Sequence, residues 1–490
     1  MSKYYLRIEG VNFDSFVLDT NHIKIIRGGS LMLLNSVDWL AEKFPDLKKI
    51  TAGASWGLFS FHADNDYQAG QLLRDARAAF NTDKHYKHAT MTLAVQPAGG
   101  DSDYSQTRSQ LEALSRWEQM QSPTVAIPTR PEPSNNHGAC QLDKLRPATK
   151  TASLRRDGGS KKAPISASCR VRWEVDGKER KPKNEHGSGQ KQFKSFYEKR
   201  TDIQGLSFTE DLNELSDDKR RNNLHGKMAV VYLDGNHFGK LARDSCFNEA
   251  KQREFDQKLR EKYQNGALKT LLTEIKDDPA WKNGNKIRLE TLLWGGDEII
   301  WVAPAWKGWW LLARFFQITN EPPWEIDDKP LTHGAGLVFC HHNAPIQPIL
   351  GLARELGDLA KANDRKNNRA AYQVLESFDH TGADLSAVRE QRWPLKDAST
   401  MILDGNAMIS VENVMQEIKA SELPKRQLYR IATIAQSDPY EAEDLAKKLQ
   451  QEADITPKID ELERCFGAGL ATWLHLLELW DYVGLEEPTP

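Results

Sequence analysis

Cysteine is scarce in this sequence of 490 residues, which contains only five, an odd number scattered along the chain. They are Cys140, Cys169, Cys246, Cys340 and Cys465. So few cysteines exclude a disulfide framework and favour a reducing compartment. No run approaches eighteen apolar residues, and the N-terminal segment lacks the apolar core of a signal peptide. We therefore expect a cytoplasmic protein that has no membrane partner.

The sequence also has little net charge, −3, and an apolar fraction of 39%, which is typical of a folded globular protein. A chain of this length exceeds one compact core, so we expect three or four domains. Strand and helix signals alternate in residues 1–118 and again in residues 225–385, whereas residues 386–490 show only helical spacing. This order predicts two α/β domains followed by a helical C-terminal domain.

Residues 119–224 differ from both flanks, because Pro, Ser, Gly, Asn and Lys dominate there and long apolar runs are missing. Between residues 141 and 200, seventeen Lys or Arg stand against seven Asp or Glu, so this stretch carries +10. Such a composition is typical of a solvated, partly disordered insertion, which is the simpler interpretation. Contact with nucleic-acid phosphates is the alternative.

Three segments of the first α/β domain are similar to three of the second, in the same order. Leu6–Phe13 parallels Tyr232–Phe238, Thr51–Trp56 parallels Leu293–Glu298, and His88–Val95 parallels His333–Val338. This order indicates a duplicated domain. The first copy has Ser55 and Trp56 where the second has Asp297 and Glu298, and neither can hold a hard divalent cation. Only the second copy is expected to bind metal there.

The most informative motif is Gly295-Gly296-Asp297-Glu298, which stands between two apolar, β-prone runs. Two glycines between such runs predict a hairpin turn with two acids at its tip. The apolar run Met228–Leu233 ends in Asp234. Carboxylates at a strand end and a hairpin turn suit a divalent-metal site for nucleoside triphosphates. We predict Asp234 and Asp297 as bridging ligands, with Glu298 as a third ligand or as a base near a ribose hydroxyl.

The segment that follows this strand supplies candidate nucleotide contacts, because backbone N–H groups at a helix start can cradle phosphates. The candidates are Gly235, Asn236, His237, Phe238, Gly239 and Lys240, together with Gly295 and Gly296 of the hairpin. An ordinary turn is the alternative for Asp-Gly-Asn. Lys361 and Arg365, four residues apart, fit two interpretations equally well. They are cations favoured at a helix C-terminus, or side chains that reach the β- and γ-phosphates.

Together these residues resemble a known family, the large polymerase/cyclase subunit of type III CRISPR effectors. Its palm domain is akin to those of GGDEF-type dinucleotide cyclases. The similar pieces occur in order within residues 1–385: Ile26–Leu34, Leu233–Lys240, Gly295–Glu298, Gly334–Pro345, and Ala353–Lys361 with Arg365. The resemblance implies an α+β fold with two ferredoxin-like palm domains in tandem. The first palm (1–118) would be degenerate and non-catalytic, the second (225–385) catalytic, and residues 386–490 a helical domain.

The resemblance also implies ATP as substrate, Mg²⁺ or Mn²⁺ as cofactor, and cyclic oligoadenylate messengers as products in antiphage defence. Two departures bear on this. Glu298 stands where the family usually has Asp, as in GGDEF cyclases, which leaves base preference and ring size open. The chain contains no His-Asp dipeptide, so we expect no HD nuclease domain.

The family often carries a zinc knuckle of paired cysteines between its palms, and this sequence retains a reduced version of it. Cys140 and Cys169 match two of the four positions, while Asp143 and Ser166 stand at the other two. Because a tetrahedral zinc takes four nitrogen or sulfur ligands, we expect a metal-free remnant. Two histidines are the candidates to complete a zinc site: His137 and His186.

Three functions remain open. The first is a nucleotidyltransferase that joins ATP by 3′-hydroxyl attack on the α-phosphate and closes the product into a ring. The second is an RNA-binding scaffold subunit of a CRISPR ribonucleoprotein, with nucleotide bound but not turned over. The third, a GTP-using dinucleotide cyclase, rests on Glu298 alone. Guide or target RNA and other effector subunits are the expected partners besides ATP, and assembly into a homo-oligomer stays open.

Overall fold

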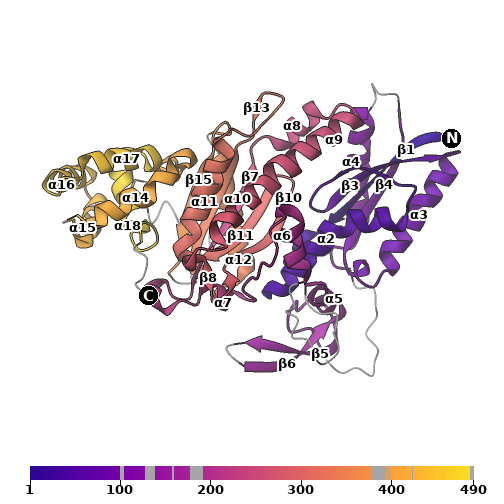
Figure 1. Ribbon diagram of the computed structural model, residues 1–490, viewed down its shortest axis with the longest axis horizontal. Coiled ribbons are helices and arrows are strands. Elements are labelled where there is room, and N and C mark those ends of the chain that lie inside the picture. The colour runs from indigo at the N-terminus through magenta and orange to yellow at the C-terminus, as the bar shows by residue number, and fades with distance from the viewer. Residues whose placement is uncertain are drawn as a thin grey trace. The chain divides into compact units, whose positions relative to one another are not determined.

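The computed structural model describes residues 1–99, 104–126, 138–156, 159–176, 191–362, 364–376, 393–395, 397–421 and 423–485. Two compact units emerge. Unit 1 comprises Met1–Gln204, Gly239–Gly266 and Leu292–Gly296, and unit 2 comprises Gly205–Phe238, Ala267–Thr291 and Asp297–Pro490. Figure 1 colours the chain along its sequence from indigo to yellow. No helix among the described residues combines the length and the apolar character that crossing a bilayer requires.

The first α/β domain is a four-stranded antiparallel sheet in the order β2-β3-β1-β4, with α2 and α3 connecting its strands (Figure 1). Its elements are β1 (Ser2–Val11), α1 (Phe13–Phe16), α2 (Ile23–Lys43), β2 (Lys48–Ala52), β3 (Trp56–Ala63), α3 (Asp66–Thr82), η1 (Tyr86–His88), β4 (Thr90–Pro97) and α4 (Tyr104–Gln121). Helix α3 begins where the Asn65 side chain accepts the N–H of Gln68, a typical N-cap. The order of strands and helices is that of a ferredoxin-like palm.

The second α/β domain repeats this arrangement in a six-stranded sheet of order β10-β11-β7-β14-β15-β16. Its strands are β7 (Lys227–Gly235), β10 (Glu290–Gly295), β11 (Glu298–Pro304), β14 (His333–His341), β15 (Arg369–Val374) and β16 (Leu403–Asp404). Its helices are α8 (Phe238–Ser245), α9 (Glu249–Gln257), η4 (Lys258–Gln264), α10 (Asn265–Ile275), α11 (Ala305–Asn320) and α12 (Ile346–Lys361). Helices α11 and α12 pack on this sheet. Two short hairpins flank the domain: β8 (Lys282–Asn283) with β9 (Lys286–Ile287), and β12 (Glu325–Ile326) with β13 (Lys329–Pro330).

Strand register tests the predicted duplication residue by residue. Glu9 pairs with Trp56 between β1 and β3, and Leu233 pairs with Ile299 between β7 and β11, so the next pair is Asp234 with Glu298. The first two parallels drawn from the sequence are therefore correct. The third is shifted by three residues: Met91 pairs with Gly10 and His333 with Gly235, so Met91, not His88, is the counterpart of His333.

The described part of the basic insertion is folded. It forms β5 (Ala148–Arg156), β6 (Gly159–Ser166), α5 (Ala167–Asp176), α6 (Lys191–Thr201), α7 (Leu212–Ser216) and η3 (Lys219–Leu224). Helix α5 packs on α2, and Ile25, Cys140, Ile165 and Cys169 form a small buried cluster. The prediction of a solvated segment is wrong for these residues, because a few of their apolar side chains are buried by packing against α2.

The C-terminal part is helical, as predicted, and forms the yellow end of the chain in Figure 1. Its elements are η6 (Ala398–Met401), η7 (Gly405–Ala407), α14 (Met408–Lys419), α15 (Lys425–Ala435), α16 (Pro439–Glu452), α17 (Thr456–Phe466) and α18 (Leu470–Leu479). Two helices, α17 and α18, form the last segment of this part. Gly467 and Gly469 lie between them with φ of 88° and 66°, which ends α17.

Glycines let α12 lie unusually close to β14. A Cβ on Gly336 would come within 1.9 Å of the Ala353 carbonyl oxygen, and a Cβ on Gly357 within 2.9 Å of the Tyr232 ring. Buried apolar side chains cover the rest of this helix face at helical spacing, among them Ile349, Leu350 and Leu356. The position of the C-terminal end of α12 therefore depends on these missing side chains.

We predict that Gly336→Ala destabilises the protein by about 1–3 kcal/mol, because the added methyl overlaps helix backbone rather than a movable side chain. Gly351→Ala on the same helix is the matched control. A Cβ there meets nothing within 4 Å, so the helix should gain about 0.5–1 kcal/mol. Urea unfolding midpoints measure both. Equal midpoints for the two variants would contradict the close approach of α12 to β14.

Candidate active site

Two aspartates meet where the strands at the centre of the second sheet end. Asp234 lies at the C-terminal end of β7, and Asp297 lies in the turn between β10 and β11. A Cβ on Gly235 would lie only 2.7 Å from the Asp297 Cβ, so Asp297 packs directly against the backbone that follows Asp234. Gly296 has a φ of 60°, the left-handed conformation that such a turn needs. The hairpin and the strand end are where the sequence predicted them.

The electrostatics of this pair show uncompensated negative charge. The pKa of Asp297 is raised to about 7, first because burial disfavours the charged carboxylate and then because Asp234 lies beside it. Glu298 adds to this effect, and Lys361 opposes it. A carboxylate held in such surroundings gains from a bound cation.

Glu298 is oriented by a tyrosine that the sequence analysis did not single out. The Tyr232 hydroxyl donates a hydrogen bond of 2.8 Å to Oε1 of Glu298. Burial and the Glu298 charge raise the pKa of Tyr232, so the phenol keeps its proton and remains a donor. Tyr232 precedes Asp234 by two residues on β7, and the period of two in a strand puts both on one face. The spacing of two residues from Asp234 was therefore the sequence signal that could have identified Tyr232.

Lys361, the last residue of α12, reaches the acids. Its ammonium contacts Oδ2 of Asp234 and lies 3.5 Å from the carbonyl oxygen of Gly235. A Cβ on Gly334 would come within 2.4 Å of the Lys361 Cγ, so the absence of a side chain on β14 gives the lysine its path. Lys361 is therefore more than a cation at a helix end, because it pairs with a predicted metal ligand.

Arg365 does not share this arrangement. Helix α12 ends at Lys361, and Arg365 lies exposed in the loop before β15, so the spacing of four does not bring the two residues onto one helical face. In the same loop, the Asn367 carbonyl accepts a hydrogen bond from the Asn236 side chain at 3.2 Å.

The predicted phosphate-binding segment divides into a buried and an exposed half. Asn236 is buried, and its side-chain amide donates to Thr332 Oγ1 at 2.9 Å, so it holds the loop in place. His237 has a left-handed φ of 53° and is exposed. Phe238 begins α8, and Gly239 and Lys240 follow in its exposed first turn. Their role as nucleotide contacts stays a prediction.

Within unit 1, the glycine pair of the hairpin is held from two sides. A Cβ on Gly295 would lie 1.9 Å from the Cβ of Ala54, in the turn between β2 and β3. The Gln264 side chain donates a hydrogen bond to the Gly296 carbonyl. The turn that presents Asp297 is thus fixed by contacts on both glycines.

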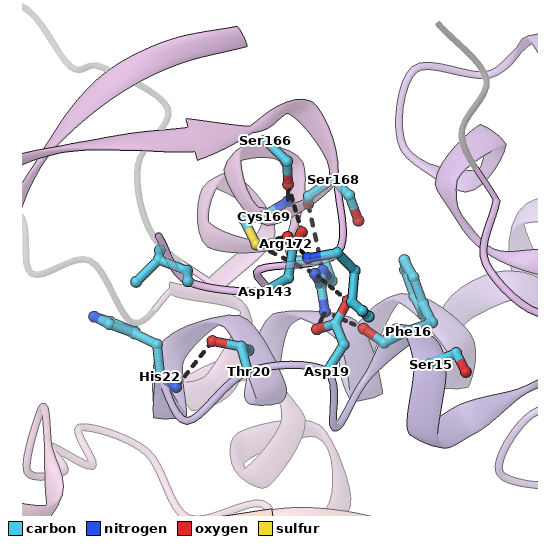
Figure 2. A network of polar contacts seen from close by, with 12 residues as sticks. Ser15, Phe16, Asp19, Thr20, His22, Asp143, Ser166, Ser168, Cys169 and Arg172 are labelled. Atoms are coloured by element: carbon cyan, nitrogen blue, oxygen red, sulfur yellow. Dashed lines mark hydrogen bonds and ion pairs between the residues drawn. The ribbon is translucent and has the colours of Figure 1, made fainter. Parts of the chain in front are cut away.

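A second cluster of chemically reactive groups lies in the insertion, where the four knuckle positions do come together; Figure 2 shows three of them, Asp143, Ser166 and Cys169. The Sγ atoms of Cys140 and Cys169 lie 3.8 Å apart, and Cys169 Sγ lies 3.2 Å from Asp143 Oδ2. The Ser166 hydroxyl donates to the same Asp143 oxygen at 2.7 Å. The donor atoms of Cys140, Asp143 and Cys169 all lie within 4.8 Å of one another. The two candidate histidines, His137 and His186, lie outside the described residues.

Two buried arginines, Arg146 and Arg172, border this cluster, and Figure 2 shows Arg172 beside Cys169. Arg172 lies 3.4 Å from Cys169 Sγ and makes two hydrogen bonds, of 2.7 and 3.0 Å, to the carboxylate of Asp19. Arg146 contacts Asp19 as well and lies 3.4 Å from Asp143 Oδ2. Two arginines and two aspartates balance without any metal. With two sulfurs and adjacent guanidinium groups, the described residues do not fit a structural zinc.

We predict that Asp19→Asn destabilises the protein by about 3–5 kcal/mol, because it leaves two buried arginines without their shared carboxylate. Arg170→Ala is the control, since Arg170 pairs with Glu174 on the surface, where such pairs contribute about 0–1 kcal/mol. Thermal unfolding measures both, and addition of EDTA should leave the wild-type midpoint unchanged. A midpoint that falls with EDTA would show that a metal holds this cluster.

No protein-family model matches the sequence, and no curated protein matches it either. Solved structures do match. A Csm1–Csm4 cassette in complex with one ATP aligns with a TM-score of 0.56 and 12% identity, over 98% of this chain and 70% of that chain. A Csm1–Csm4 cassette in complex with cA3 aligns with a TM-score of 0.56 and 12% identity, over 99% and 70%.

A third match is a Csm1–Csm4 subcomplex in the type III-A CRISPR-Csm interference complex, with a TM-score of 0.50 and 11% identity over 97% of this chain and 69% of that chain. At these identities the likeness shows the fold. It confirms the predicted fold class, tandem palms followed by a helical domain, while the four-part division of the sequence stays a prediction. This chain has a fold similar to that of Csm1, in agreement with the resemblance to the large subunit of type III CRISPR effectors.

Proposed function

We propose that this protein is a nucleotidyltransferase that joins ATP molecules and closes the product into a cyclic oligoadenylate, in a type III CRISPR-like defence. The observation that carries the proposal is the meeting of Asp234 and Asp297 on a palm fold, with the pKa of Asp297 raised to about 7 by burial and like charge. Structures of similar fold hold ATP and cA3, the substrate and a product of this kind of reaction.

The acid site fits a divalent cation. Its three carboxylates, Asp234, Asp297 and Glu298, offer the oxygen ligands that Mg²⁺ and Mn²⁺ prefer, and the Lys361 ammonium contacts Asp234. Asp234 and Asp297 would hold the ion, with Glu298 completing the set. A bound divalent ion would lower the pKa of the attacking ribose hydroxyl and neutralise the triphosphate. Zinc in the insertion is not part of this proposal.

The residues of the chain divide the remaining tasks. Tyr232 holds Oε1 of Glu298, and no described residue donates to Oε2, which is left to accept a proton or to bind the ion. Lys361 holds the Asp234 carboxylate in place and can turn its ammonium to the phosphates when a nucleotide is bound. The hydroxyl that attacks belongs to one ATP and the α-phosphate to another, so the step forms a 3′-phosphodiester and releases pyrophosphate.

Partners follow from the same likeness. The matching Csm1 chains were solved together with Csm4, and we propose a subunit of that kind, and RNA, as partners of this chain. A GTP-using cyclase is the second candidate, because Glu298 stands where GGDEF cyclases have glutamate. Equal concentrations of ATP and GTP in one reaction distinguish the two, since mass spectrometry identifies the bases in the product.

We expect purified protein to release pyrophosphate from ATP with Mn²⁺ or Mg²⁺ and to form phosphodiester products. The double variant Asp297→Ala, Glu298→Ala should lose at least about a hundredfold in rate, because it removes charge that acts at the triphosphate. The matched control is Asp444→Ala, Asp460→Ala, which removes two exposed acids of α16 and α17. Unchanged product formation by the first variant would refute the assignment of these acids.

A finer prediction concerns Tyr232. Tyr232→Phe removes only the hydroxyl, so we expect kcat to fall about tenfold with little change in KM for ATP, since the lost hydrogen bond orients Glu298 rather than the nucleotide. Glu298→Asp withdraws the carboxylate from the same hydroxyl. If the two act through one contact, the double variant is no slower than the slower single one.

The control for this series is Tyr4→Phe, whose hydroxyl also donates to a carboxylate, Asp66, at 2.8 Å on a strand of the other palm. It should keep the wild-type kcat. Fully additive losses in the Tyr232 and Glu298 variants would mean that the hydrogen bond has no part in the reaction.

A further inference from the structure

Unit 1 contains a large cavity that neither the acid site nor the proposed reaction uses. It has a volume of about 1430 Å³ and is lined by α2, η1, β5, β6, α5 and α6, so the basic insertion forms much of its wall. In Figure 1, α5 and the β5–β6 hairpin lie beside each other. Binding sites for single small molecules commonly measure about 300–1,000 Å³. This cavity has room for a longer ligand.

Most cations that line the cavity have no acidic partner. Lys84, Lys150, Lys199 and Arg200 form no ion pair with any described residue. Of the acids on the same walls, Asp38 pairs with Lys49 and Glu174 pairs with Arg170, which leaves Glu42. The cavity therefore carries excess positive charge that its own residues do not neutralise, and an anionic ligand would do so.

Arg200 is the clearest sign of a missing anion. Its guanidinium lies over the Phe196 ring at 4.3 Å, and its Nε is buried without a hydrogen-bond partner among the described residues. Burial, followed by the nearby charge of Arg260, lowers the pKa of Arg200 to about 10, and the charge of Asp38 opposes this shift. A buried guanidinium is costly unless it is hydrogen-bonded to a group of opposite charge, and phosphate is the group that guanidinium binds best.

Aromatic rings stand next to these cations. Trp39 of α2 and Trp173 of α5 line the cavity and are half-buried. Trp173 stacks on His22 with centroids 5.0 Å apart. Trp39 is enclosed by Phe80 at 4.7 Å, Tyr86 at 4.8 Å and the Lys43 ammonium at 5.1 Å, so Trp173 is the better candidate to stack with a base. Rigid indoles beside unpaired cations are the arrangement with which proteins bind single strands, because bases stack on the rings while phosphates meet the charges.

We propose that this cavity binds a short stretch of single-stranded nucleic acid. The phosphates lie on Lys150, Lys199 and Arg200, and a base stacks on Trp173. The size of the cavity fits several linked nucleotides rather than one. The inference does not depend on the proposed enzymatic activity, because it rests on a different set of residues and requires no turnover. An acidic polypeptide would meet the cations but would have no use for the indoles.

The test is fluorescence anisotropy of the full chain with a short labelled oligouridylate, without ATP or divalent metal. Lys150→Glu, Lys199→Glu should weaken binding by about tenfold or more at low salt, because both residues are exposed and their charges reverse. The matched control is Lys447→Glu, Lys448→Glu, two exposed lysines of α16. It should bind as the wild type does. Equal loss in both double variants would reduce the effect to net charge and overturn the site.

Two further measurements separate phosphate contacts from stacking. Lys150→Ala, Lys199→Ala should reduce the slope of log K against log salt by about 1.4, since each phosphate contact on a single strand contributes about 0.7. Trp173→Leu keeps an apolar side chain against His22, so the fold is preserved. It should weaken binding about fivefold or more while the slope stays the same. A Trp173→Leu variant that binds normally would overturn the stacking.

Comparing different strands shows whether the site prefers RNA or DNA. Oligouridylate and oligothymidylate strands compare RNA with DNA, and preference for either supports a single-strand site. Equal binding of polyaspartate, or no binding of any strand, overturns the proposal. The Asp297→Ala, Glu298→Ala variant should bind the oligonucleotide as the wild type does, so failure of the enzymatic proposal and failure of this one give different results.

Discussion

The close approach of Asp297 to the backbone after Asp234 is the constraint on which the candidate site depends. It requires a residue without a side chain at Gly235, a left-handed turn residue at Gly296, and the β7–β11 register that brings the hairpin to the strand end. The price in electrostatic free energy is visible in the raised pKa of Asp297. Lys361 compensates one charge only. The remaining negative charge favours a divalent cation at this end of β7, and the cation in turn favours a triphosphate.

Sequence reasoning located the acids because each sits at a position with a local signal. Asp234 ends an apolar strand, and Asp297 follows a glycine pair between two apolar runs, so strand and turn rules place both. Tyr232 was within reach of the same reasoning, since residues two apart on a strand share a face. Its bond to Glu298 needed the β7–β11 register as well, which the sequence does not state.

Other contacts had no local signal. Lys361 reaches Asp234 only because Gly334 and Gly336 let α12 lie close to β14 and because the helix ends at that lysine, and such distances depend on packing rather than on spacing. The same holds for Asp19, which meets Arg146 and Arg172 from positions 127 and 153 residues away. Composition predicted a solvated insertion, because it counts charges and cannot show that several of them are buried and paired with one another.

That buried network indicates how a metal knuckle can be replaced. In a zinc knuckle, four cysteine thiolates bind the ion at their centre, which offsets two of their four negative charges. Here Asp143 and Ser166 occupy two of the four positions. The Ser166 hydroxyl donates a hydrogen bond to the Asp143 carboxylate, so the two side chains bind each other. The guanidinium of Arg172 supplies positive charge next to Cys169. Ion pairs join the insertion to Asp19, and buried charge therefore contributes to the stability of its fold.

The first palm lacks the negative charge that the second palm has at the equivalent position. Register makes Arg7, Glu9 and Trp56 the counterparts of Tyr232, Asp234 and Glu298. Arg7 donates a hydrogen bond of 3.0 Å to Glu9 and lies over the Trp56 ring at 4.7 Å. One acid is thus neutralised within its own strand, and the second is replaced by a ring that offers no oxygen. The first palm keeps the strand order and loses the net negative charge. A cation site requires this negative charge as well as the fold. Changes in two or three side chains on one face of the sheet are therefore enough to distinguish a metal-binding palm from a structural one.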